Sequence, residues 1–247
     1  MPFDSRPAWA RISGVLYAIV IITGIFAFMY VPGQIVVPDD AAATIANIKS
    51  NTLLYRAGIA ALLLNQIAFF LLPLALYVLL SPINHKLAVV MVLAALAGIP
   101  LALAGAAERL LILNLVTGSL SAPPAALADL VSTARASANA LTAFSTTFWG
   151  LWLLPFGYLV FRSGFLPRIL GLCLMAGCFG YVINLFGLIL VPDYSTLTIA
   201  SVLRLPASTG EIGIGLWLLL IGARPRQAPA FNPTGAPYVL IRPIALT

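Results

Sequence analysis

Six stretches of the chain are each long enough and apolar enough to cross a lipid bilayer. A helix that crosses a hydrocarbon core of about 30 Å needs roughly 20 apolar residues, because each residue adds 1.5 Å. The stretches are residues 12–30, 53–80, 87–116, 141–161, 166–191 and 199–221. They predict an all-α fold, a polytopic membrane bundle of six transmembrane helices.

The share of charged residues excludes a water-soluble domain. Charged residues make up 8% of the chain and hydrophobic residues 62%, whereas soluble domains are about 25% charged. The formal net charge of +6 would suggest nucleic acid as the partner of a soluble protein. No basic run with interleaved aromatic residues is found, so we expect the lipid bilayer, and no nucleic acid, as the partner.

The distribution of basic residues predicts the sidedness of the bundle. One side of the predicted bundle carries the N-terminus, the loops at 81–86 and 162–168, and the tail, with Arg6, Arg11, Lys86, Arg162, Arg168, Arg224 and Arg226. The opposite loops carry Asp39, Asp40, Asp129 and Asp193 against only Lys49 and Arg135. By the positive-inside rule both termini are cytoplasmic, which requires an even number of spans. We therefore expect a cell-membrane domain over residues 1–222 and an irregular, proline-rich cytoplasmic tail over residues 223–247.

Two hairpins of the predicted bundle look like copies of each other. Residues 37–46 read VPDDAAATIA and residues 191–200 read VPDYSTLTIA, with six of ten positions identical. Each segment follows an odd-numbered span and precedes an even-numbered one. The pattern favours a duplication of the hairpin of spans one and two as the hairpin of spans five and six, and chance similarity in an apolar chain is the alternative. In both copies the Pro-Asp pair indicates a helix start.

Charged residues within or beside the spans are the candidate functional residues. Glu108 and Arg109 are neighbours, so their side chains point about 100° apart on a helix and must find partners elsewhere. Glu211 is the deepest charge and needs a partner or a proton, because a charge at the bilayer centre costs roughly 3 kcal/mol. We expect Glu211 to pair with Arg109, and Glu108 to face Arg56 or Arg204. The candidate ligand-binding residues are Arg56, Glu108, Arg109, Arg204, Glu211 and Asn184.

Three interpretations of these charges remain open. The charges form a cavity in the extracytoplasmic half of the bundle that binds a small anionic or polar ligand, as in a transporter or a sensor. Alternatively, they neutralise one another as a structural lock within a membrane scaffold or assembly protein. In the third interpretation Arg56, Glu108 and Arg204 simply lie among lipid headgroups. Separately, we expect Asn65 and Gln66 on the second span to form hydrogen bonds between helices.

Motifs for catalysis and cofactor binding are missing from the sequence. There is no Gly-x-Ser-x-Gly elbow, no phosphate loop and no metal-ligand spacing. The single histidine, His85, has no cysteine or carboxylate beside it. Cys173 and Cys178 are five residues apart, which places them on different sides of a helix. We therefore expect no metal and no cofactor, and a membrane-embedded enzyme is the least favoured function.

Several segments resemble a known family. They include ARISGVLYAIVIITGIFA, YLVFRSGFLPRILG and GEIGIGLWLLLIG, of which the second is the most specific. The chain is similar over roughly residues 9–222 to the bacterial family catalogued as domain of unknown function 4386. The resemblance implies a bacterial integral membrane protein of the inner membrane, and it assigns no catalytic residues.

Overall fold

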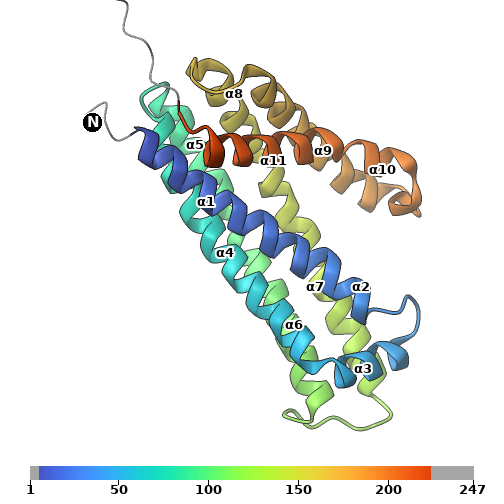
Figure 1. The fold of residues 1–247 in the computed structure, drawn as a ribbon. Helices are drawn as coiled ribbons and strands as arrows, with labels where there is room; N and C mark the ends of the chain where they lie inside the picture. The colour runs from blue at the N-terminus through green and yellow to red at the C-terminus, as the bar shows by residue number, and fades with distance from the viewer. Residues whose placement is uncertain (1–5, 224–247) are drawn as a thin grey trace, which may run out of the picture.

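The computed structural model describes residues 6–223, without the side chain of Ser195, and within that range the chain forms helices joined by turns (Figure 1). The first half contains α1 (Arg6–Ile25), the π-helical turn η2 (Phe26–Tyr30), α2 (Val31–Ile35), α3 (Ala41–Ser50), α4 (Thr52–Leu80), α5 (His85–Ala97) and α6 (Ile99–Thr117). The second half contains α7 (Leu127–Leu151), α8 (Leu153–Ser163), α9 (Arg168–Leu190), the 3-10 turn η3 (Tyr194–Thr196), α10 (Thr198–Val202) and α11 (Leu205–Leu220). The predicted tail, residues 223–247, lies outside the described residues except for Ala223.

Within residues 6–223, five helical runs are long and apolar enough to cross a membrane. They are Arg6–Ile35, Thr52–Leu80, His85–Thr117, Leu127–Ser163 and Arg168–Leu190. The sixth predicted span, residues 199–221, is divided into α10 of 5 residues and α11 of 16 residues by a turn at Leu203 and Arg204. The all-helical multi-pass architecture is thus confirmed, and the count of six spans is not.

Two of the long runs contain an internal break. α5 ends at Ala97 and α6 begins at Ile99, so Gly98 separates them. Pro100 explains this break, because proline has no backbone N–H and its ring clashes with the carbonyl four residues earlier. In the other run, Trp152 separates α7 from α8. α7 begins at Leu127, fourteen residues before the predicted start at 141, since the polar residues between them continue the helix.

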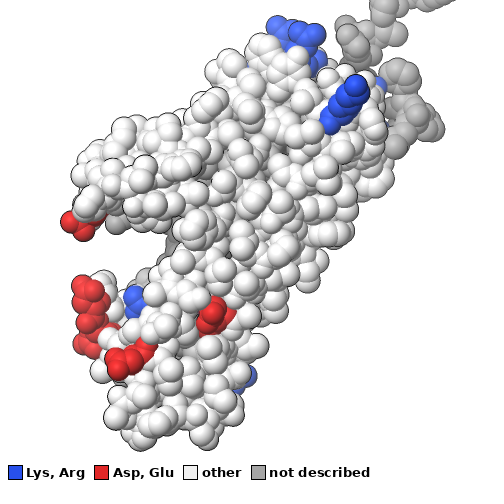
Figure 2. Space-filling view, turned by 180° about the vertical axis from the view of Figure 1, so that it is seen from behind, with Lys and Arg blue, Asp and Glu red and all other residues white. Residues whose placement is uncertain are grey.

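The helices form a long bundle with one diverging hairpin. α1, α4, α6 and α7 run along the bundle, α3 lies across one end, and α8 lies at the opposite end (Figure 1). We call these the α3 end and the α8 end. The hairpin arm, residues 168–220, contains α9, η3, α10 and α11. α11 packs on α1 and α9, and α9 packs on α7 and α8. The outer part of the arm diverges from the bundle, which leaves a hollow that Figure 2 shows in the molecular surface.

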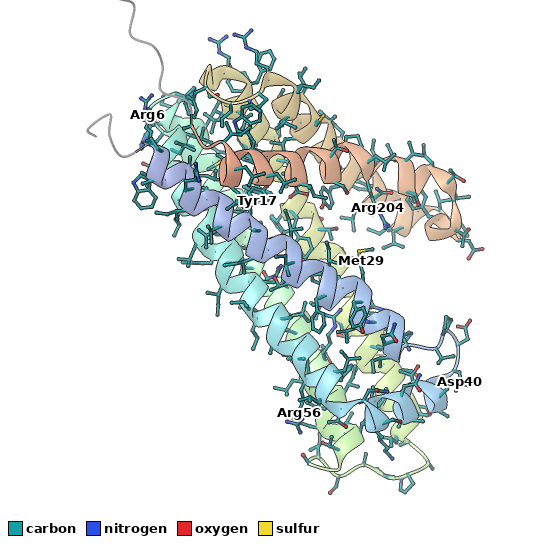
Figure 3. The ribbon with its side chains drawn as sticks, in the orientation of Figure 1. Arg6, Tyr17, Met29, Asp40, Arg56 and Arg204 are labelled. Carbon is teal, nitrogen blue, oxygen red and sulfur yellow. The ribbon has the colours of Figure 1, made fainter. Side chains whose placement is uncertain are left out.

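Charged side chains gather at the two ends of the molecule. Figure 2 shows basic residues at one end and most acidic residues toward the other. In Figure 3, Arg6 lies at the α8 end and Asp40 at the α3 end. This separation agrees with the expected sidedness, in which the α3 end is extracytoplasmic. The orientation of the termini in a membrane stays a prediction.

The two similar segments share an unusual backbone conformation. Asp39 and Asp193 occupy the same position of the two segments, and they are the only non-glycine residues in 6–223 with a positive φ, 56° and 53°. Aspartate adopts this left-handed conformation more readily than most residues. A short helix follows in each copy, α3 or α10. These features support the duplication, which stays a prediction.

The N-cap of α3 is provided by Asp40, the residue after the shared Pro-Asp pair. Its Oδ1 accepts a hydrogen bond of 2.8 Å from the backbone N–H of Ala43. We expect Asp40→Ala to lower the stability of α3 by about 1 kcal/mol, because one helix N–H loses its acceptor. Hydrogen exchange of the first amides of α3 measures the effect. Asp40→Asn keeps an acceptor and should exchange like the wild-type chain, so equal exchange in all three proteins would contradict the capping role.

Candidate functional site

The structure does not gather the predicted charges into one cluster. Arg56 lies near the α3 end and Arg204 lies on the hairpin arm, well apart in Figure 3. Both side chains are exposed. Within residues 6–223, no ion pair joins either arginine to Glu108 or Glu211. The expected contact of Glu108 with Arg56 or Arg204 is therefore not formed.

Glu108 instead has a neutral partner. Its Oε1 accepts a hydrogen bond of 2.9 Å from the Ser137 hydroxyl, which joins α6 to α7. The side chain is half-buried. A hydroxyl donor satisfies one of the lone pairs of a carboxylate without neutralising its charge.

The Arg109 side chain contacts an aromatic ring. Its guanidinium carbon lies 5.8 Å from the centroid of the Phe28 ring, within the range of a cation–π contact. Tyr55 of α4 also interacts with it electrostatically. Among the described residues, no carboxylate forms an ion pair with Arg109.

Glu211 and Arg109 belong to different cavities. The Tyr181 hydroxyl of α9 donates a hydrogen bond of 3.4 Å to Glu211 Oε2. The expected pairing of Glu211 with Arg109 is not formed among residues 6–223, because Glu211 contacts Tyr181 and lines one cavity, whereas Arg109 contacts Phe28 and lines another. Asn184 of α9 lines neither cavity, and both polar atoms of its side chain are buried without a hydrogen-bond partner in residues 6–223.

The first cavity, which we call the arginine cavity, lies toward the α3 end. It has a volume of about 170 Å³ and is lined from α2, η2, α3, α4, α6 and α7. Its walls are mostly aliphatic. Its polar lining residues are Thr44, Tyr55, Arg109, Arg135 and Asn139. Arg135 and Asn139 also line a neighbouring hollow together with Asp39 and Asp40, so the arginine cavity and this hollow adjoin.

The second cavity, which we call the glutamate cavity, lies where α1 and α11 diverge. It has a volume of about 240 Å³, and Glu211 is the only charged side chain among its described lining residues. Asn65 also reaches its wall. The Asn65 amide nitrogen donates hydrogen bonds of 2.7 Å to the Val20 carbonyl and 3.0 Å to the Thr23 hydroxyl. The expected interhelical hydrogen bonding of Asn65 is confirmed, whereas Gln66 bonds to Asn65 itself.

The π-helical turn η2 contributes to both cavities. Ala27 lines the arginine cavity and Phe28, the next residue, lines the glutamate cavity. A π-helical turn within a longer helix is frequent at functional sites. Ala27 and Phe28 point to different sides of this turn. The turn therefore forms part of the wall of both the arginine cavity and the glutamate cavity.

Arg135 and Tyr55 are functional candidates that the sequence interpretation missed. Arg135 was counted as a loop charge, because the fourth span was expected to start at residue 141. In the structure, Val131, Ala134 and Ala138 are buried on one face of α7. Their spacing of three and four residues is the signal that would have placed Arg135 on a helix.

Residues 6–223 contain no group of three or more histidine, cysteine, aspartate or glutamate side chains arranged for a metal. Cys173 and Cys178 are both free thiols.

The fold and the composition together define a multi-pass α-helical membrane protein. The family model described as "Domain of unknown function (DUF4386)" matches residues 12–222. Because this match covers most of the chain, the protein belongs to the DUF4386 family. No curated protein and no solved structure matches the chain.

Proposed function

We propose that this protein binds a small organic anion in the arginine cavity, as the binding step of a transporter or a sensor in the cell membrane. One observation carries the proposal. Arg109 and Arg135 line the same largely apolar cavity, and in the described part of the chain neither forms an ion pair with a carboxylate. Both side chains are half-buried. A cation partly removed from water without a counter-ion loses solvation, and a bound anion would offset that loss.

The chemistry of the walls indicates the class of ligand. Guanidinium groups bind carboxylate and phosphate oxygens through paired hydrogen bonds. Tyr55 and Asn139 would add neutral hydrogen-bond donors beside the two arginines. The aliphatic remainder of the wall favours a short hydrocarbon group, and the volume of about 170 Å³ limits its size. A short-chain carboxylate meets these requirements.

We expect Arg109 and Arg135 to contribute unequally to anion binding. Arg135 also borders the hollow that contains Asp39 and Asp40, and these carboxylates partly offset its charge. Arg109 faces the cavity with Phe28 and Tyr55 as its neighbours. An anion would therefore gain more from Arg109 than from Arg135.

The test uses hexanoate as the probe and the full-length protein in detergent. We expect hexanoate to raise the unfolding temperature, because a ligand that binds the folded state stabilises it. Hexanamide, with the same chain and no charge, should have no such effect. Arg109→Gln should weaken hexanoate binding at least tenfold and Arg135→Gln less. Arg56→Gln is the matched control, because Arg56 is exposed and lines neither cavity. Equal binding to the Arg109→Gln and Arg56→Gln variants would reject the site.

The structural lock remains the alternative, and one contact favours it. The hydrogen bond from Ser137 to Glu108 joins α6 to α7 and gives one of the charges a structural partner. Under this alternative, hexanoate has no effect on the wild-type protein. Arg109→Gln and Glu108→Gln then lower its unfolding temperature without any ligand, and the protein acts as a scaffold.

A further inference from the structure

The glutamate cavity combines a single acid with aromatic walls. Tyr17, Phe28, Phe69, Trp149 and Tyr181 all contribute to its lining, from five different segments: α1, η2, α4, α7 and α9. The rings of Phe28 and Phe69 both meet the Trp149 ring at an edge, with centroids 5.8 Å and 6.4 Å away. The face of an aromatic ring carries partial negative charge and can attract a cation.

Two hydrogen-bonding groups at the cavity lack partners. The Tyr17 hydroxyl is buried, with the side chain 2% exposed, and it has no hydrogen-bond partner within residues 6–223. The Trp149 indole N–H is also buried and unpaired in the described chain. Buried polar groups in proteins usually have partners, so the Tyr17 hydroxyl and the Trp149 N–H are both available to bind a ligand in this cavity.

The charge of Glu211 is not balanced within the cavity. Glu211 receives one hydrogen bond, from Tyr181, and interacts electrostatically with Tyr17. Arg204, at the start of α11, interacts electrostatically with Tyr181. Arg204 is exposed and does not line the cavity. The cavity is therefore negative in sign and apolar in most of its surface.

We propose that the glutamate cavity is a second binding site, which takes a small organic cation: an amine or methylated ammonium group with an apolar substituent. The cation would lie against the Glu211 carboxylate and the faces of the aromatic rings, an arrangement that attracts ammonium groups strongly when water is excluded. The apolar substituent would fill the rest of the 240 Å³. This site is opposite in charge to the arginine cavity and does not depend on it.

Geometry gives the cation a route to the site. Gly14 and Gly215 bring α1 and α11 into contact on the side toward the α8 end. The cavity lies beyond this contact, at the base of the hollow between the hairpin arm and the bundle. From Tyr17 onward the two helices diverge, and the cavity lies between them. An amphiphilic cation could therefore enter sideways from the hydrocarbon region of the membrane.

The test compares two probes of the same shape on the full-length protein in detergent. Benzyltrimethylammonium carries the charge, and neopentylbenzene has carbon in place of nitrogen. Binding is followed by the unfolding temperature and by tryptophan fluorescence, to which Trp149 contributes. We expect stabilisation by the cation and little by the neutral compound. No binding of either probe, or equal stabilisation by both, would overturn the proposal.

Two variants locate the site. Glu211→Gln keeps the shape of the side chain and removes its charge, and we expect at least tenfold weaker binding of benzyltrimethylammonium. Glu108→Gln is the matched control, because Glu108 contacts Ser137 and does not line the cavity. Unchanged affinity in Glu211→Gln would reject the site. Should that variant fail to fold, the contrast between the two probes on the wild-type protein decides the question. Hexanoate binding at the arginine cavity is measured separately, so failure of one site leaves the other untouched.

Discussion

Replacement of Gly157 by leucine should separate α8 from α9 and destabilise the protein by at least about 3 kcal/mol. A Cβ atom at Gly157 would lie 2.6 Å from the Gly171 carbonyl oxygen and 2.9 Å from the Met175 backbone nitrogen. These are backbone atoms, which cannot rotate out of the way. Without the hydrophobic effect to drive helices together inside a bilayer, close backbone packing is a main source of stability.

The unfolding temperature and the size-exclusion profile in detergent measure this loss. Gly33→Leu is the matched control, since a Cβ at Gly33 meets nothing within 4 Å and the residue also lies in a helix. We expect this control to behave like the wild-type chain. Equal unfolding temperatures for Gly157→Leu and Gly33→Leu would show that α8 and α9 are not packed as described.

The second large effect is expected at Trp152, where Trp152→Ala should cost about 3–5 kcal/mol. Trp152 is the residue that joins α7 to α8, and its side chain is fully buried. Its ring stacks on Phe156 with centroids 5.0 Å apart and meets the Phe69 ring at an edge with centroids 5.4 Å apart. The indole N–H has no hydrogen-bond partner in residues 6–223, so the loss comes from packing alone.

Two further variants separate packing from other effects. Trp152→Phe keeps a ring in the stack and removes an unpaired donor, so we expect a much smaller loss than with alanine. Phe186→Ala removes a ring that is 57% exposed on α9 and should change the unfolding temperature little. Thermal unfolding of the wild-type protein and the three variants in the same detergent ranks their stabilities. A Trp152→Ala variant as stable as Phe186→Ala would disprove the role of Trp152 in the core.

The sequence predicted the helices better than it predicted their interruptions. Long apolar runs determine where helices cross a membrane, because unpaired backbone groups are excluded there. Local breaks depend on single residues and on neighbours. Pro100 favours an interruption of its helix, and the break lies two residues earlier, at Gly98. The turn at Leu203 and Arg204 carries the same signal, because Pro206 is the second residue of α11 as Pro100 is of α6.

For the candidate site, the sequence predicted the depth of the charged residues but not their contacts. Depth along a helix follows from residue numbers, so Glu108 and Arg109 could be placed toward the extracytoplasmic end. The partner that a side chain faces depends on which helices are neighbours, and this packing is not given by the sequence of one helix. The Phe28 ring, which lies against Arg109, carries no charge and gave no reason to expect it there. Arg135 was overlooked because α7 begins earlier than its apolar residues suggest.

The divergence of the hairpin arm has a consequence for the surrounding lipid. The outer part of α9 exposes Phe186, Ile189 and Leu190, with exposed fractions of 57%, 57% and 73%, and Met29 on the bundle is 70% exposed. In a bilayer, acyl chains cover such surfaces and fill the space that the arm leaves open. Lateral pressure in the leaflet then acts on the angle of the arm. We therefore expect access to the glutamate cavity to depend on how tightly the lipid acyl chains are packed.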